Sequence, residues 1–204
     1  MGCYMAQKRI DNRKDVLLLL LYSPGKGKSV NEPIVGRTRL VKMLFLFKME
    51  ALAHFRKGTQ INDENFYSFF AWDFGPFSSQ VYDDLTFFIL RGFVENPDSQ
   101  EESLPESAEE WEHWLESGVE SGAEESEVTD YREEEFKLTA KGARWVRDNL
   151  WVCLSDSQKE LLRQFKAKLA GAPLRAILKY VYTQYPKMTS QSKIKDEILG
   201  QYVD

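Results

Sequence analysis

Cysteine and histidine are scarce in this chain of 204 residues, which contains two of each. Cys3 and Cys153 lie far apart and match neither a disulfide framework nor a metal-binding spacing, which is typical of a reducing compartment. His54 and His113 have no second histidine or cysteine at a spacing that zinc sites use. The sequence therefore predicts a cytoplasmic protein that holds no metal and no cofactor.

Long apolar runs are also absent. The run VLLLLLY at 16–22 has seven residues, whereas a helix that crosses a bilayer needs roughly 20. Charged residues at 11–15 precede the run and no small-residue cleavage site follows it, so it does not have the pattern of a secretory signal. We expect no association with a membrane.

The next stretch, YSPGKGKSVNEPIVGRTRL at 22–40, carries Gly-Lys-Ser at 27–29 but lacks the rest of a phosphate-binding loop. Such a loop needs a glycine five positions before Gly27, where this chain has Tyr22, and a helix directly after the Lys-Ser pair. Pro33 instead favours an extended conformation for the residue before it. We interpret the stretch as a cationic hinge between two helices, with contact to an anion as its expected use.

Catalytic arrangements are missing as well. His54 lies near the end of an apolar helical pattern, where we expect a partly exposed helix residue rather than a base. Asp73 fits a cap or turn residue that anchors the next helix. Asp83 and Asp84 are neighbours in a helical pattern and point in different directions, so they do not form a paired acid and base. We predict that the protein is not an enzyme.

Charge is distributed unevenly along the chain. The formal net charge is −5, yet residues 95–135 hold 17 acidic residues and a single base, Arg132. The rest of the chain keeps 26 of the 27 basic and 15 of the 32 acidic residues, which gives it a net charge of +11. A basic body favours an anionic partner such as nucleic acid. The acidic segment is either a solvated insertion or an arm that competes with that anion over the basic surface.

Within the acidic segment, EEWEHWLESG places three apolar residues at positions i, i+3 and i+4, namely Trp111, Trp114 and Leu115. A short helix would present them on one face edged with glutamate. We expect this face either to dock on a partner or to pack locally on the body.

Hydrophobic spacing predicts helices at 11–22, 38–56 and 78–91, and strands at 66–72, 93–94 and 135–139. Asp11 or Asn12 would cap the first helix and Thr38 the second. A helix, a short strand, a long loop and a second strand describe a wing, whose loop is the acidic segment. A capped helix follows the last strand. The C-terminal third is helical, with a capping box at Ser155 and Gln158.

Together these elements predict an α+β fold, a mainly helical winged-helix-like domain with a small antiparallel sheet. The domain spans 1–150, with the acidic insertion at 95–135, and residues 151–204 form a C-terminal helical extension. Pro173 opens the second helix of this extension, and SKIKDEIL at 192–199 forms a last short helix.

Four stretches together resemble the YwgA-like proteins and the related Panacea domain of SocA-type antitoxins: GRTRLVKMLFLF, FYSFFAWDFGPFSSQVYDDL, RGFVE and EFKLTAKG. The resemblance covers roughly residues 11 to 150. It implies a winged-helix-like domain in prokaryotic or phage-associated proteins, which act as toxin-neutralising or adaptor modules. It implies no catalytic residues. The acidic insertion and the C-terminal helices depart from the family pattern.

Two functions follow from these observations. The first is a non-catalytic, antitoxin-like adaptor that binds a protein partner or toxin, with the apolar helical stripes as a homodimer interface. The alternative is a nucleic-acid-binding winged-helix protein, similar to a transcription regulator, with an acidic regulatory arm. Its DNA or other anion would contact the cationic residues Lys26, Lys28, Arg37, Arg39 and Lys42. Its reading helix would begin with Ser78, Ser79 and Gln80, although no arginine stands there.

Overall fold

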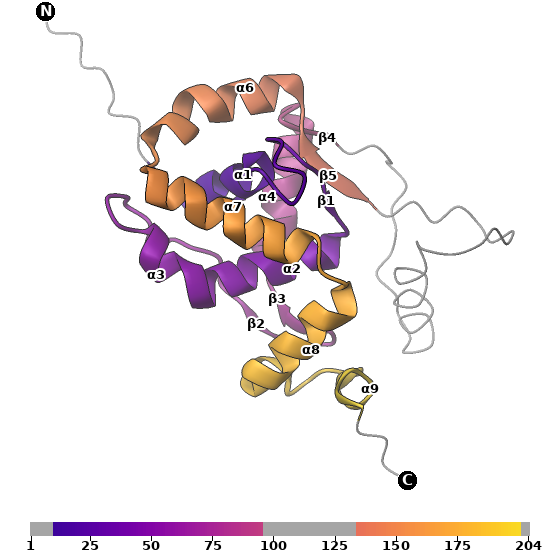
Figure 1. Cartoon of the computed structure of the whole chain (residues 1–204). Coiled ribbons are helices and arrows are strands. Elements are labelled where there is room, and N and C mark those ends of the chain that lie inside the picture. The colour runs from indigo at the N-terminus through magenta and orange to yellow at the C-terminus, as the bar shows by residue number, and fades with distance from the viewer. Residues whose placement is uncertain (1–9, 96–133, 201–204) are drawn as a thin grey trace, which may run out of the picture.

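The structure is a computed structural model that describes residues 10–95 and 134–200. Figure 1 shows the arrangement of its elements. The expected docking residues Trp111, Trp114 and Leu115 lie outside the described residues, so their role stays a prediction. Among the described residues, no helix is both long enough and apolar enough to cross a membrane.

Helix α1 (Arg13–Tyr22) lies at the centre of the fold, and every residue from Val16 to Tyr22 is buried. Asn12 caps it, because its side chain accepts a hydrogen bond from the Lys14 N–H while the Asp15 carboxylate accepts one from the Asn12 N–H. These reciprocal bonds satisfy N–H groups that the first turn leaves open. The predicted helix at 11–22 and the cap at Asn12 are confirmed.

The long helix expected at 38–56 is present in three parts, α2 (Arg37–Leu46), η1 (Phe47–Ala51) and α3 (Leu52–Phe55). The cap expected at Thr38 is wrong: the helix begins at Arg37, and Gly36 with φ 88° occupies the N-cap position without a side-chain hydrogen bond. The middle part is a π-helix, in which the Leu52 N–H donates to the Phe47 carbonyl five residues back.

A three-stranded antiparallel sheet with the order β1-β5-β4 covers one end of α1. Its strands are β1 (Ile34–Val35), β5 (Glu135–Leu138) and β4 (Val94–Glu95). The predicted wing is confirmed in its pairing, since Val94 lies opposite Leu138. The stretch at 22–40, which we interpreted as a hinge, contains strand β1, in which Ile34 pairs with Phe136.

A second, two-stranded sheet is formed by β2 (Phe70–Trp72) and β3 (Gly75–Phe77). The aromatic strand expected at 66–72 is therefore shorter, and Gly75-Pro76 begins a return strand instead of only breaking the chain. Gly75 has φ 85°, and a Cβ there would lie 3.1 Å from the Tyr182 ring. A side chain at this position would be strained by both the backbone conformation and the close ring.

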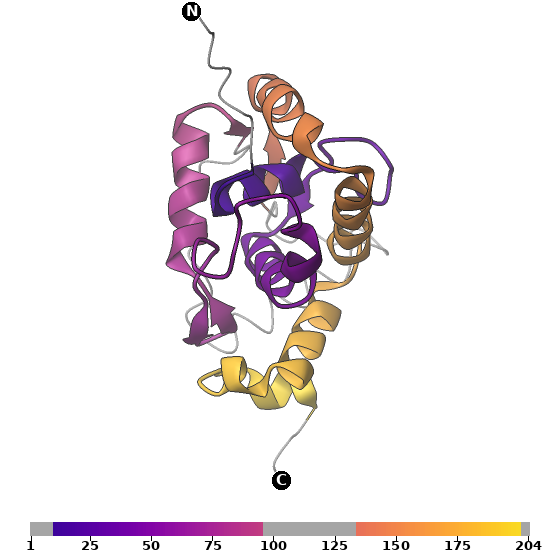
Figure 2. The same ribbon diagram turned by 90° about the vertical axis from the view of Figure 1, so that its left-hand side faces the viewer.

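Helix α4 (Ser79–Leu90) confirms the helix expected at 78–91 and lies along one edge of the molecule, with the β2–β3 hairpin at its lower end in Figure 2. After β5 come α6 (Ala140–Asn149), η2 (Trp151–Cys153), α7 (Asp156–Ala170), α8 (Leu174–Gln184), η3 (Pro186–Thr189) and α9 (Lys195–Leu199). The predicted capping box at Ser155 and Gln158 is present. The fold is thus the expected mostly helical α+β architecture with a small antiparallel sheet and C-terminal helices.

The C-terminal helices pack on the central helices through buried polar contacts as well as apolar ones. The fully buried Lys166 ammonium on α7 donates to the carbonyls of Leu21, Ser23 and Glu32 at 2.7, 2.9 and 2.7 Å. Two of these carbonyls lie at the C-terminal end of α1, where a cation is favoured. Lys166 therefore ties α7 to α1 and to the loop that follows it.

Candidate functional site

The β2–β3 hairpin presents three aromatic side chains on one face. Phe70 and Trp72 are two residues apart in β2, so they point to the same side, and Phe77 pairs directly opposite Phe70. The ring centroids are 5.5 Å apart for Phe70 and Phe77, 5.8 Å for Phe70 and Trp72, and 6.3 Å for Trp72 and Phe77. We call Phe70, Trp72 and Phe77 the aromatic hairpin face.

This face is open to solvent, because Phe70 is 45% and Trp72 is 50% exposed. Large apolar side chains that gather at the surface mark contact sites more often than isolated ones do. Tyr82 in the first turns of α4 continues the face, with its ring 5.4 Å from that of Phe77. The aromatic pattern predicted a strand here but not its exposed face, and the alternation of Phe70 and Trp72 was the available signal.

Lys42 fixes the hairpin to α2. Its ammonium donates to the carbonyls of Phe74 at 2.6 Å and Pro76 at 3.0 Å, on either side of Gly75. The side chain is only 3% exposed, and burial lowers the pKa of Lys42 to about 7. The expectation that Lys42 contacts an anion at the surface is therefore corrected: the side chain is used inside the fold to hold the hairpin turn.

Asp73 provides a second anchor for the hairpin. Its carbonyl accepts from the Lys193 N–H at 2.8 Å, and its carboxylate pairs with the Lys193 ammonium at 2.7 Å. Asp73 is thus a turn residue, as one of its two expected roles had it, but it holds the C-terminal segment rather than the start of the next helix, where Ser78 occupies the N-cap position. Two anchors from different parts of the chain keep the aromatic hairpin face in one orientation.

The space beneath the hairpin is too small for a ligand. Trp72, Phe77, Tyr82 and Lys42 line a hollow of about 20 Å³, which has room for about one water molecule. A small organic molecule needs a larger enclosure. The exposed rings are therefore suited to contact with a macromolecule.

The two arginines of the expected cationic site bind internal partners. Arg37 pairs with Glu134 through bonds of 2.9 and 2.5 Å, and its guanidinium lies 5.2 Å from the centre of the Tyr82 ring. Arg39 donates to the carbonyls of Val35 at 2.9 Å and Leu169 at 3.1 Å, and also to that of Ala172. Both side chains are half-buried, so the structure brings neither of them to the surface as a free phosphate contact.

Lys26 and Lys28 are exposed on the loop after α1, as the sequence analysis expected. The loop folds around its own carboxylate, because Glu32 accepts from the N–H groups of Gly27 at 3.1 Å and Ser29 at 2.9 Å. A Cβ at Gly25 would lie 2.5 Å from this carboxylate, so a side chain there would displace Glu32 from the loop. The Glu32 carboxylate therefore already occupies the N–H groups that an external anion would need.

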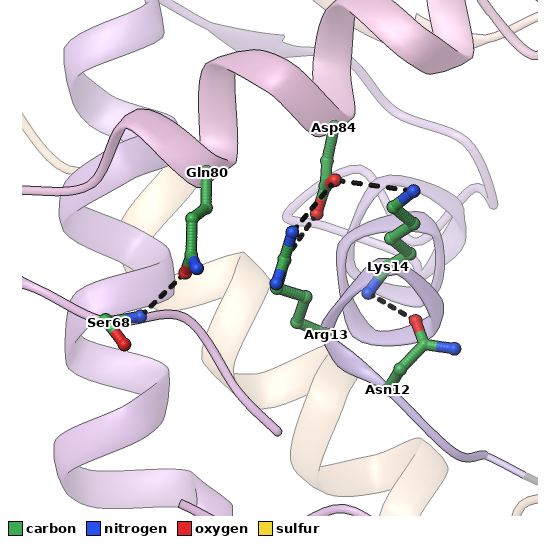
Figure 3. Close-up of polar contacts among 6 residues, drawn as sticks. All are labelled: Asn12, Arg13, Lys14, Ser68, Gln80 and Asp84. Carbon is green, nitrogen blue, oxygen red and sulfur yellow. Dashed lines mark hydrogen bonds and ion pairs between the residues drawn. The ribbon is translucent and has the colours of Figure 1, made fainter. Parts of the chain in front are cut away.

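The start of α4 differs from that of a reading helix. Ser78 is buried, Ser79 is exposed, and the Gln80 side chain accepts from the Ser68 N–H at 3.0 Å (Figure 3). Of the three expected contact residues, Ser79 alone points to solvent. Gln80 instead fastens the segment before the hairpin to α4.

Helix α4 is also tied to α1 by ion pairs to the buried Asp84 carboxylate. The Asp84 carboxylate accepts from Arg13 Nε at 2.8 Å and lies 3.6 Å from the Lys14 ammonium, as Figure 3 shows. Asp83, its neighbour, is exposed, which confirms that the two carboxylates point in different directions. The face of α4 that carries Gln80 and Asp84 is thus turned into the protein.

Among residues 10–95 and 134–200, no group of His, Cys, Asp and Glu side chains is arranged to hold a metal ion. His54 is exposed at the end of the helix, as expected. Comparison with known proteins gives no match to a family model, to a curated protein or to a solved structure. The resemblance to the YwgA-like proteins and SocA-type antitoxins therefore stays a prediction.

Proposed function

We propose that the protein is a non-catalytic adaptor that binds a protein partner through the aromatic hairpin face. The observation that carries this proposal is the exposure of Phe70 and Trp72 on a hairpin held by Lys42 and Asp73. A face that is fixed before binding loses little conformational entropy when a partner covers it. Tryptophan and other aromatic residues carry much of the binding energy at protein interfaces.

The partner we propose is a protein that has an apolar patch on its surface. A toxin would be such a partner, in line with the family resemblance. We also propose that the protein is cytoplasmic and forms a homodimer. Because the hollow beneath the hairpin is small, we expect a partner that covers the rings and not one that inserts between them.

Site-specific crosslinking tests this proposal. A photo-crosslinking phenylalanine analogue at Trp72 should give one adduct in the host cell, while the same analogue at Trp145, which is 39% exposed on α6, should not. With that partner purified, Trp72→Ala should weaken binding by about 2 kcal/mol or more. Equal adducts at both positions, or unchanged affinity of Trp72→Ala, would reject the aromatic hairpin face as the contact.

Nucleic-acid binding is the second candidate function, and the exposed Lys26 and Lys28 support it. Two phosphate contacts would make the affinity fall with salt with a slope of roughly −2 on a log–log scale. Lys26→Glu with Lys28→Glu should abolish that dependence, whereas the protein-adaptor proposal predicts that these changes leave partner binding intact. Deletion of 97–130 should strengthen DNA binding if the acidic arm competes with it.

A further inference from the structure

A groove separate from the hairpin lies between α2 with η1 and the pair α7 and α8. It encloses a volume of about 220 Å³, which about seven water molecules would fill in the liquid. Its walls are mostly apolar: Leu46, Phe165, Leu169, Ala172, Ala176 and Ile177. The two alanines leave room where larger side chains would close the groove. We call it the α7–α8 groove.

The α7–α8 groove carries a carboxylate that is held by a tyrosine. Glu50 lines the groove and accepts a hydrogen bond from the Tyr185 hydroxyl at 2.9 Å. Tyr180 also lines the groove and is 42% exposed, and the Glu50 carboxylate beside it raises the pKa of its hydroxyl. A carboxylate beside an exposed tyrosine ring is a combination that attracts organic cations.

Glu50 belongs to the π-helix η1. A π-turn uses one residue more than an α-turn, costs hydrogen-bond geometry, and is found frequently at functional sites. The Tyr185 ring packs 5.0 Å from the ring of Phe45, which fixes the hydroxyl that holds the carboxylate. The irregular turn and the packed tyrosine together set the position of the negative charge at the groove.

The other charged residue of the groove is Lys168 on α7. A cationic ligand would place its ammonium at Glu50 and away from Lys168, because unlike charges attract and like charges repel. The apolar walls of the groove suit a hydrocarbon body of about six to eight carbon atoms, given the volume of the groove.

We propose that the α7–α8 groove binds a small organic amine, with the ammonium at Glu50 and the apolar body between α7 and α8. This site is independent of the aromatic hairpin face and goes beyond the adaptor function. The apolar walls of the groove would bury the hydrocarbon part of the ligand. Glu50 and the Tyr180 ring would attract its ammonium group and so favour a cation.

The test uses 2-phenylethylammonium as the probe and 2-phenylethanol as its neutral counterpart with the same apolar body. Amide chemical shifts of the full chain are followed by NMR up to about 10 mM of each probe, because weak fragments bind in the millimolar range. The amine should bind at least about tenfold more tightly than the alcohol. The shifts should centre on Glu50 and Ala176.

Variants separate the two parts of the site. Glu50→Gln should remove the preference for the amine, whereas Glu64→Gln, a change at an exposed carboxylate in the loop before β2, should retain it. Ala176→Leu should fill the groove and weaken both probes, and Ala176 is exposed enough for the change to leave the fold intact. Equal binding of amine and alcohol, an unaltered Glu50→Gln variant, or no shift at all would overturn the proposal.

Discussion

Replacing Gly142 by alanine tests how closely α6 must approach the wing. A Cβ at this position would lie 2.1 Å from the Phe93 carbonyl oxygen, whereas real Cβ atoms essentially never come within 3.0 Å of another heavy atom. The backbone would therefore have to move apart by about 1 Å, which is the overpacking that cores resist. Hydrogen bonds from the Thr139 N–H to Phe93 O at 3.0 Å and from the Thr139 hydroxyl to Gly92 O at 2.7 Å oppose this movement.

Two effects of opposite sign decide the result. Alanine is favoured over glycine inside a helix by about 1 kcal/mol. Overpacking costs about 1–3 kcal/mol, and weakening the Thr139 hydrogen bonds adds about 1 kcal/mol. The net loss of unfolding free energy is about 2 kcal/mol, which lowers Tm by about 4–8 °C for a chain of this size.

Urea denaturation of Gly142→Ala beside Gly171→Ala measures this difference. At Gly171 the nearest atom to a new Cβ is Lys26 Cδ at 3.4 Å, an ordinary contact, and φ is −92°. Gly171→Ala should therefore be neutral or stabilise by up to about 1 kcal/mol. If Gly142→Ala unfolds at the same urea concentration as Gly171→Ala, the close approach of α6 to Phe93 does not exist.

Two further predictions concern buried charges. Burial lowers the pKa of Lys42 and Lys166 to about 7 each, so between pH 7 and about 9 the unfolded chain binds more protons than the folded one. The unfolding free energy should rise with pH by up to about 1.4 kcal/mol per pH unit for each lysine. For Lys42→Met, unfolding free energies measured by urea denaturation at several pH values should rise less steeply with pH. Asp84→Asn should lower the unfolding free energy by about 1–2 kcal/mol, because the partly exposed Arg13 loses the charge-assisted hydrogen bond to Asp84. The same change at the exposed Asp83 should cost under about 0.5 kcal/mol, and equal losses at both sites would contradict the ion-pair reasoning.

Signals that are local in the sequence predicted local structure well. The capping box at Ser155 and Gln158 and the cap at Asn12 were identified because each depends on residues a few positions apart. The wing strands were identified from local patterns on either side of the insertion, although their pairing joins Val94 to Leu138 across it. The C-terminal helices were likewise predicted from the spacing of their own apolar residues, without reference to the elements on which they pack.

Two strands were not predicted. Strand β1 has two residues and exists because Ile34 meets Phe136, about a hundred positions away. The β2–β3 hairpin is local, since Trp72 pairs with Gly75, and it was missed because Gly75-Pro76 was interpreted only as a break in the chain. The pairing of β1 has no signature within its own segment, so the sequence indicated a hinge there.

The buried lysines explain why the basic residues that the sequence indicated do not form the candidate site, which lies at the hairpin instead. A lysine in sequence indicates a surface charge, since isolated lysines are rarely buried. Here backbone carbonyls from remote segments converge on Lys42 and on Lys166, and they satisfy the donors that burial would otherwise leave unpaired.

The same contacts change the meaning of the positive charge on the body. A net charge of +11 counted along the chain treats every cation as available, whereas Lys42, Lys166 and Arg39 point their donors at backbone carbonyls inside the fold. Arg37 is neutralised by Glu134, which belongs to the acidic segment itself. The surface field that an external phosphate would meet is therefore weaker than the count suggests. By contrast, nearly half of each of the Phe70 and Trp72 side chains is exposed, so the proposed partner would gain free energy by burying these rings.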